Sequence, residues 1–262
     1  MTTDFSEDDM DDLAAQMHAA VNALDVAKVE ALLEAGVPPD VWGIDVEYDR
    51  PLQVVARSKG ERALSIAKAL IVAGAEIDFQ GDYGCTALAR SIERDGADDW
   101  AVARYLIGAK ADPSLADKDC FCPAEIANKN GNNAAILAML EAGMDANVHG
   151  PVGPLIWYCA WDEPEMVRAL LAHGANPNGV ATGIGCRGQT PLQRAAESFG
   201  ECSIDEESFR DIAIQLIEAG ADPAQIDPAP NCLASFLLSR KEKADLTGLL
   251  PVIVEPTPLE TL

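Results

Sequence analysis

A short phrase recurs six times along this chain, and no other feature of the sequence constrains the fold as strongly. Each copy contains two apolar residues, two spacer residues, a residue that is usually glycine, and a turn-forming segment. The copies begin at Leu32 (LLEAGVPPD), Leu70 (LIVAGAEID), Leu106 (LIGAKADPS), Met139 (MLEAGMDAN), Leu170 (LLAHGANPN) and Leu216 (LIEAGADPA). Their spacing indicates a structural unit of ~33 residues, repeated along the chain with insertions.

The phrase has the chemistry of a helix end. Its apolar pair packs inward, and its glycine stands where many helices end in a residue of left-handed backbone conformation. Lys110 takes the glycine's place in the third copy. We therefore expect Lys110 to adopt the same conformation at a modest cost in strain.

A second phrase lies between the copies of the first and predicts the start of another helix. It begins at Arg50 (RPLQVVA), Thr86 (TALARSI), Cys122 (CPAEIAN), Gly153 (GPLIWYC), Thr190 (TPLQRAA) and, weakly, Asn231 (NCLASFL). Proline is accepted in the first helical turn because its missing N–H would have no intrahelical partner there, and a preceding threonine can cap the helix. Each unit is therefore predicted to be a turn, a short helix, a second helix and a turn onward.

The two phrases together resemble the ankyrin-repeat family. The family pattern D-x-x-G-x-T-P-L-H-x-A-A, followed by G-H-x-E-I-V-x-L-L-L-x-x-G-A-x-x-N, is matched in parts by residues 117–123, 190–196 and 164–178. Cys120 replaces the turn glycine and Gln193 replaces the usual histidine. No copy keeps that histidine, which in the family ties neighbouring turns together, so we expect weaker or rearranged hydrogen bonds between repeats.

The resemblance implies an all-α solenoid of stacked helix-turn-helix units with projecting turn fingers. One such unit cannot bury its apolar face alone, so neighbouring units stack. We expect about six repeats and a capping helix, near residues 231–239, within a domain that spans residues 13–250. Residues 1–12 hold six acidic residues and no basic one, which predicts a flexible acidic arm. Residues 251–262 form a proline-containing tail.

The charge excludes one class of partner and favours another. The formal net charge is −24, from 43 acidic and 19 basic residues. Nucleic-acid binding needs clustered cations, so no nucleic-acid partner is expected. A basic protein partner fits better, although the same charge also serves a soluble surface that resists self-association. The odd number of cysteines, seven, and the lack of a signal or a long apolar run predict a cytoplasmic location without membrane contact. The protein is expected to be monomeric on its own.

We find no catalytic constellation in the sequence. H-E-x-x-H, G-x-x-x-x-G-K-[ST] and G-x-S-x-G are all absent. Cys120 and Cys122 are the nearest approach to a metal motif, but zinc sites usually have C-x-x-C spacing and further ligands, and the three histidines lie elsewhere. The chain is therefore expected to be no enzyme and to hold no cofactor and no metal.

Residues 183–190 (GIGCRGQT) match the G-x-G-x-x-G spacing of dinucleotide-binding loops. Such a loop must follow a strand and open the helix of a βαβ unit. Here it follows the exit turn of one predicted repeat and precedes the first helix of the next. We interpret the glycines as backbone freedom in a long finger, with a small-molecule sensor or enzyme site at Gly183–Gly188 as the alternative.

The resemblance implies binding of another protein through turn tips and first helices. Carried over position by position, the expected partner contacts are Glu47, Asp49, Arg57, Asp82, Tyr83, Arg94, Asp119, Phe121, Lys129, Trp161, Arg187 and Glu197. Trp161, Tyr83 and Phe121 are the expected hot spots, because aromatic residues often dominate interface energy. Trp157 is left open between core packing and partner contact.

The sequence therefore predicts a non-enzymatic module that binds a partner protein and inhibits or neutralises it. An immunity protein directed against a toxin is one such case. A cytoplasmic adaptor or scaffold is the alternative within the same class.

Overall fold

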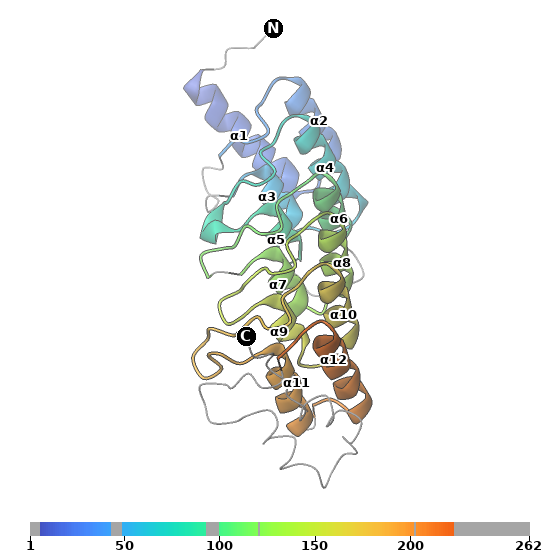
Figure 1. Ribbon diagram of the computed structural model, residues 1–262. Coiled ribbons are helices and arrows are strands. Elements are labelled where there is room, and N and C mark those ends of the chain that lie inside the picture. Colours follow the sequence, from blue (N-terminus) through green and yellow to red (C-terminus); the bar gives the residue numbers. More distant parts are fainter. Residues whose placement is uncertain (1–5, 43–48, 93–99, 120, 202, 223–262) are drawn as a thin grey trace, which may run out of the picture. The chain divides into compact units, whose positions relative to one another are not determined.

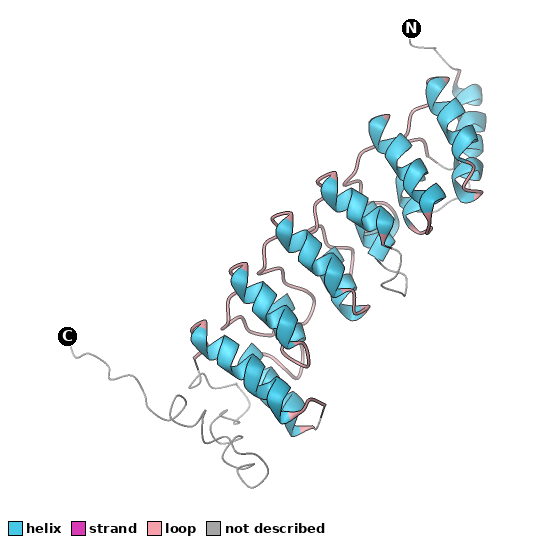
Figure 2. Cartoon of the chain, turned by 90° about the vertical axis from the view of Figure 1, so that its right-hand side faces the viewer, coloured by secondary structure: helices cyan, strands magenta, loops and turns pink. Residues whose placement is uncertain are grey.

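The computed structural model describes residues 6–42, 49–92, 100–119, 121–201 and 203–222 of the 262-residue chain. The chain divides into two compact units, Met1–Met144 and Asp145–Leu262. Each unit is a stack of helix pairs (Figures 1 and 2). Twelve α-helices and no β-strand occur in the described ranges, as the all-α prediction requires.

Unit 1 contains four helix pairs. They are α1 (Glu7–Asn22) with α2 (Val26–Glu34), α3 (Pro51–Ala56) with α4 (Glu61–Val72), α5 (Ala87–Ile92) with α6 (Ala101–Gly108), and α7 (Pro123–Lys129) with α8 (Asn133–Glu141). The first helices α3, α5 and α7 contact one another in order, and the second helices α4, α6 and α8 do the same (Figure 1). The turns project beyond the first helices, on the side away from the second helices.

Unit 2 contains two helix pairs, α9 (Leu155–Cys159) with α10 (Pro164–Ala172) and α11 (Pro191–Gly200) with α12 (Glu206–Glu218). Thr190 caps α11 through its side chain, which accepts from the Gln193 amide, and Pro191 occupies the first turn as predicted. The acidic insertion near residue 205 lengthens this last pair. Asp205 caps α12, and hydrogen bonds from the Ser208 amide and hydroxyl lower the pKa of the Asp205 carboxyl.

The helix ends confirm the interpretation of the first phrase. The five phrase glycines (Gly36, Gly74, Gly143, Gly174 and Gly220) all have positive φ, and Lys110 has φ of 71° in the same place. The Lys110 amide donates to the Ile107 carbonyl, and the Ala111 amide donates to the Leu106 carbonyl, both at 3.0 Å. This is the paired hydrogen-bond pattern with which glycine-capped helices end.

Replacement of Lys110 by glycine should stabilise the protein by about 0.5–1 kcal/mol. Glycine removes the left-handed strain of ~1–2 kcal/mol, and the gain is partly offset by its larger entropy in the unfolded chain. Urea unfolding would measure the shift in midpoint at constant slope. The reverse change, Gly74→Lys, serves as the control and should destabilise; equal midpoints for Lys110→Gly and the parent would contradict the expectation.

The acidic arm is shorter than the sequence predicted. Helix α1 begins at Glu7, so Glu7–Asp12 belong to its first turns rather than to a flexible arm. The Ser6 hydroxyl caps the helix by accepting from the Asp9 amide, and acidic residues are favoured there by the helix dipole. The remainder of the arm (1–5), the expected capping helix (231–239) and the tail (251–262) lie outside the described residues.

The hydrogen bonds between repeats are rearranged, as the missing histidines suggested. A turn carboxylate or amide oxygen in one repeat accepts the backbone N–H of a turn residue in the next: Asp40 from Glu76, Asp78 from Asp112, Asn147 from Asn176, and Asn178 from Asp222, at 2.7–3.0 Å. Gln53, which stands at the histidine position, donates to the Phe79 carbonyl at 2.7 Å. Asp and Asn side chains in the turns therefore join neighbouring repeats within each unit.

Candidate partner-binding surface

Two of the expected contacts in unit 1, Asp49 and Arg57, belong to an ion cluster centred on the buried Asp49 carboxylate. The Asp49 side chain is only 2% exposed and accepts from Arg57 Nη2 at 2.7 Å and from the Asp82 amide at 2.9 Å. Arg90 Nη2 lies 3.6 Å from the same carboxylate, and the Arg90 side chain is 9% exposed. Asp49 therefore holds α3, α5 and the next turn together, and its prediction as a direct partner contact is wrong.

Several other expected contacts of unit 1 lie on exposed fingers. Tyr83 is 62% exposed, with left-handed backbone (φ 54°), and the Lys118 ammonium lies 5.8 Å from its ring centroid. Asp119 is exposed, and the Lys129 ammonium lies 5.7 Å from the centroid of the half-buried Phe121 ring. These side chains remain candidates for contact with a partner. Glu47 and Arg94 lie outside the described residues.

Unit 2 brings a larger aromatic cluster together on α9 and α11. The Arg194 guanidinium lies 3.8 Å from the Trp161 ring centroid and 4.5 Å from that of Trp157. Glu197 Oε2 accepts from Arg194 Nη1 at 2.8 Å and from Gln189 Nε2 at 3.0 Å. This set, the Trp–Arg cluster (Trp157, Trp161, Gln189, Arg194 and Glu197), holds its members in fixed positions before any partner arrives.

The two tryptophans of this cluster differ in exposure. Trp157 is 4% exposed and packs edge-on against Tyr158 at a centroid distance of 5.2 Å, so it belongs to the core of the unit. Trp161 is half-buried and lies in the turn two residues beyond the end of α9. One face of the Trp161 ring covers the Arg194 guanidinium, while part of the side chain is exposed to solvent. The exposed part is available for contact with a partner, as an aromatic hot spot requires.

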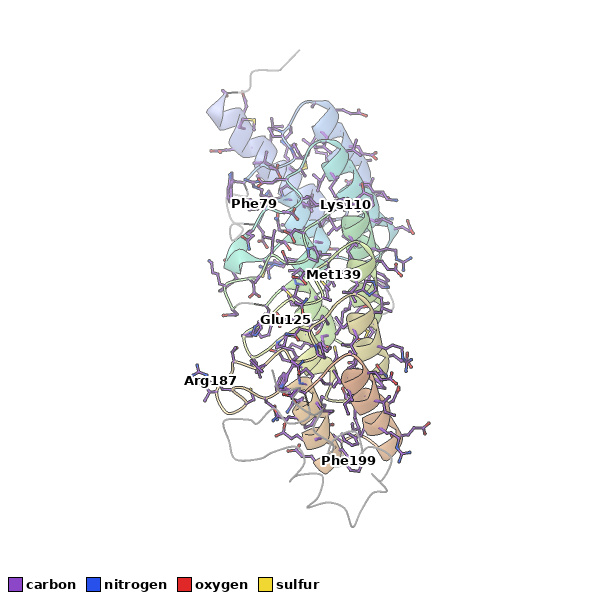
Figure 3. All side chains as sticks on the ribbon, in the orientation of Figure 1. Phe79, Lys110, Glu125, Met139, Arg187 and Phe199 are labelled. Carbon is purple, nitrogen blue, oxygen red and sulfur yellow. The ribbon has the colours of Figure 1, made fainter. Side chains whose placement is uncertain are left out.

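The glycine-rich stretch forms a closed finger that is tied to its neighbour. The Ala181 amide donates to the Gln189 carbonyl and the Gly188 amide to the Ala181 carbonyl, which closes the finger. The Thr182 and Gly183 amides donate to the Val152 carbonyl at 2.6 and 3.0 Å, which joins it to the finger that contains the His149–Pro154 bridge. Arg187 extends from this finger away from the helices (Figure 3).

The structure explains why glycine occupies positions 183, 185 and 188 of this finger. Gly185 and Gly188 have φ of 92° and 83°, a region that other residues rarely adopt. A Cβ on Gly183 would lie 2.7 Å from Val152 Cγ1. The amides of residues 182, 183, 186, 188 and 189 donate within the protein. A phosphate cradle needs such amides to be available, so the geometry does not support the nucleotide alternative.

Replacement of Gly183 by alanine should destabilise unit 2 by about 1–2 kcal/mol, because the new methyl group meets the stiff, β-branched Val152 side chain. The double variant Gly183→Ala/Val152→Ala should recover most of that loss in a double-mutant cycle. Gly185→Ala is the matched control. Nothing lies within 4 Å of its Cβ position, so its cost comes from backbone strain alone and should not respond to Val152→Ala. The measurement compares the urea midpoints of the parent, the three single variants and the two double variants with Val152→Ala.

Within the described ranges, no group of three or more His, Cys, Asp or Glu side chains is placed to hold a metal ion. Burial, together with the Glu125 charge, raises the pKa of the Cys122 thiol to about 12, so that it stays protonated and is a poor ligand or nucleophile. Cys120 lies outside the described residues. None of the described helices has the length and hydropathy needed to cross a bilayer.

The structure adds surface residues that the sequence analysis missed. Ile184 is fully exposed (108%) at the tip of the long finger, and Val180 is 38% exposed at its base. Arg194 is the centre of the Trp–Arg cluster, although only Trp161 and Glu197 were predicted. An isoleucine between two glycines, GIG, is the signal that could have indicated an exposed apolar tip.

Comparisons with known proteins agree on the fold. A family model described as ankyrin repeats (3 copies) matches residues 124–227. No curated protein matches the chain. Among solved structures, the ankyrin-repeat domain of Bcl-3, of the IkappaB protein family, is 19% identical, covers 84% of this chain and 92% of its own, and has a TM-score of 0.66. An ankyrin-repeat domain from Acinetobacter baumannii AYE is 24% identical, with coverage of 77% and 97% and a TM-score of 0.65. An ankyrin-repeat protein designated EF0377 is 18% identical, with coverage of 78% and 98% and a TM-score of 0.61.

Proposed function

We propose that this chain, which has an ankyrin-repeat fold and matches the ankyrin-repeat family model over residues 124–227, binds a partner protein through its fingers and first helices and inhibits that partner. Repeat proteins of this kind bind other proteins through the extended surface that their stacked units create. The observation that supports a specific site here is the half-buried Trp161 stacked on Arg194. Glu197, which pairs with Arg194, also accepts from Gln189 at the base of the finger that carries the exposed Ile184.

The Trp–Arg cluster suits a binding role for an energetic reason. Interfaces depend on a few aromatic and arginine side chains held in well-packed surroundings. Arg194 is fixed by two rings and by Glu197, so binding would cost little side-chain entropy. Among the described residues no group of three or more His, Cys, Asp or Glu side chains could hold a metal ion, and the raised pKa of the Cys122 thiol keeps it protonated.

In this proposal the protein acts in the cytoplasm as an inhibitor. The buried Cys122 is a free thiol, which suits a reducing compartment. An immunity protein that neutralises a toxin is the sharpest form of the hypothesis. An adaptor is the second candidate, because the expected contacts lie in both units and each unit could hold its own partner.

The test begins with capture of the partner from the organism that encodes the chain. Full-length protein, the Trp161→Ala variant and a Trp42→Ala control are immobilised in parallel, and proteins retained by the parent and the control but not by Trp161→Ala are identified. The activity of the captured protein is then measured with increasing amounts of this chain. A stoichiometric loss of activity supports inhibition, while unchanged activity in a stable complex supports the adaptor and contradicts inhibition.

A further inference from the structure

One surface of unit 2 has a composition unlike the rest of the chain. It is formed by His149, Val152, Val180, Ile184 and Arg187, and we call it the finger patch. Thr182 and Gly183 donate to the Val152 carbonyl, so the two fingers that carry these residues lie together. Ile184 and Val180 are exposed aliphatic side chains, His149 and Arg187 are exposed, and Val152 is half-buried.

Ile184 is presented on a rigid support. Five amides between residues 182 and 189 donate within the protein, and positive φ at Gly185 and Gly188 defines the path of the loop. An apolar side chain on a constrained tip loses little conformational entropy when a partner covers it. Ile184 therefore has the properties of an anchor that inserts into an apolar pocket or lies along an apolar segment.

The charge around this anchor is opposite in sign to that of the whole chain. The chain carries −24, yet no Asp or Glu occurs between Met166 and Ala196, and residues 146–161 contain no charged residue of either sign except the titratable His149. Arg187 is exposed and makes no hydrogen bond or ion pair among the described residues, whereas Arg194 is paired with Glu197. The nearest acidic residues in sequence are Asp145, four positions before His149, and Glu197, ten positions after Arg187. The Glu197 carboxylate is already paired with Arg194.

We propose that the finger patch binds an acidic, apolar segment of the partner protein, in which a large apolar side chain stands next to an Asp or Glu. The apolar side chain would cover Ile184 and Val180, and the carboxylate would pair with Arg187. Charges more than ~8 Å apart are largely screened at physiological salt, so the local patch governs this contact rather than the total charge. This inference rests on the proposed function and names the chemistry of its partner, which differs from the basic partner that the total charge suggested.

The remainder of the surface contributes selectivity. Elsewhere the chain is strongly acidic, so a partner segment that carries carboxylates is repelled from those regions and tolerated at the finger patch. Electrostatic complementarity of this kind acts mainly on the encounter rate and on the choice of partner.

The test uses the full-length protein and a displayed library of random short peptides as the probe. Enriched peptides should combine aromatic or aliphatic residues with neighbouring Asp or Glu. For these peptides Ile184→Ser should weaken binding about 30-fold, as expected for an anchor residue. Arg187→Glu should weaken it about tenfold in low salt and less in high salt, because the guanidinium is exposed to screening.

The matched controls lie on α4, a second helix of unit 1. Val72→Ser removes an exposed aliphatic side chain from α4, and Arg62→Glu makes the same change of charge on that helix. Both should leave binding within about twofold, since single surface changes away from a contact have small effects. Enrichment of basic peptides, or equal loss with Arg62→Glu and Arg187→Glu, would overturn the inference.

Experiments with the same variants also test two other occupants of the finger patch, a second copy of the chain and a segment of the same chain. A dimer seen by sedimentation and lost in Ile184→Ser would assign the patch to a second copy of the chain. Cross-links from the patch to residues 223–262 of the same molecule would assign it to that segment. Either result overturns the inference. A captured native partner that binds Ile184→Ser and Arg187→Glu as well as the parent would also overturn it, while leaving the proposed function intact.

Discussion

Replacement of Asp49 by asparagine should lower the stability of unit 1 by about 3 kcal/mol. The Asp49 side chain is 2% exposed and accepts from the Arg57 guanidinium and the Asp82 amide, with Arg90 3.6 Å away. Removal of one member of a buried ion pair commonly costs 3–5 kcal/mol, since the remaining charge stays desolvated with less countercharge. The lower end of that range applies because the Arg57 side chain is 38% exposed and is partly solvated.

The measurement is urea unfolding combined with native-state hydrogen exchange. The exchange data should show the largest loss of protection in α3 and α5, which Asp49 joins, because repeat stability depends on neighbouring units. Glu165→Gln is the control. It breaks the exposed pair between Glu165 and Arg168 and should leave the midpoint unchanged. Similar losses for the two variants would show that Asp49 contributes no more than a surface carboxylate.

Truncation of Trp161 to alanine should weaken binding of the captured partner by about 2 kcal/mol, or roughly 30-fold in Kd. The indole covers the Arg194 guanidinium at 3.8 Å, so its loss removes both an apolar contact and the desolvated face that keeps Arg194 in place. Calorimetry with the purified partner measures the change, and circular dichroism checks that folding is intact. Trp161→Phe should retain part of the affinity, because it keeps an aromatic face.

Trp42→Ala provides a matched control for this prediction. Trp42 is 51% exposed and, like Trp161, lies beside an arginine: the Arg50 guanidinium is 5.2 Å from its ring centroid. It was not among the expected contacts. If affinity falls by the same amount in Trp42→Ala and Trp161→Ala, the effect belongs to the loss of any Trp–Arg stack and not to a hot spot at Trp161.

Local chemistry in the sequence was sufficient to predict the repeat architecture. The Leu-Leu-x-x-Gly phrase determined where second helices end, and even Lys110 could be assigned its left-handed conformation, because helix ending is a property of a few adjacent residues. Pro191 and Thr190 likewise identified the start of α11. The first turns of α1 were not predicted, because a run of acidic residues is typical of a solvated arm, whereas in the structure Ser6 and Asp9 form a capping box.

The candidate surface was predicted only in part, for a physical reason. Alignment to the family pattern placed Trp161, Arg187 and Glu197 on the binding side, but it could not distinguish an exposed carboxylate from a buried one. Burial depends on side chains that are distant in the chain. Asp49 is buried by arginines 8 and 41 positions further on, and the turn residues Asp40 and Asn178 are engaged by backbone amides 36 and 44 positions away.

By itself the sequence determined the class of fold, the helix boundaries at most repeats and the separation of fingers from helices, because each of these follows from periodicity and from the conformational preferences of single residues. Tertiary structure decided which of the candidate residues can meet a partner. It buried Asp49 and Trp157, placed Arg194 against Trp161, and exposed Ile184 on a finger that Val152 holds in position. Those outcomes depend on contacts between successive repeats, and such contacts exist only once the repeats have stacked.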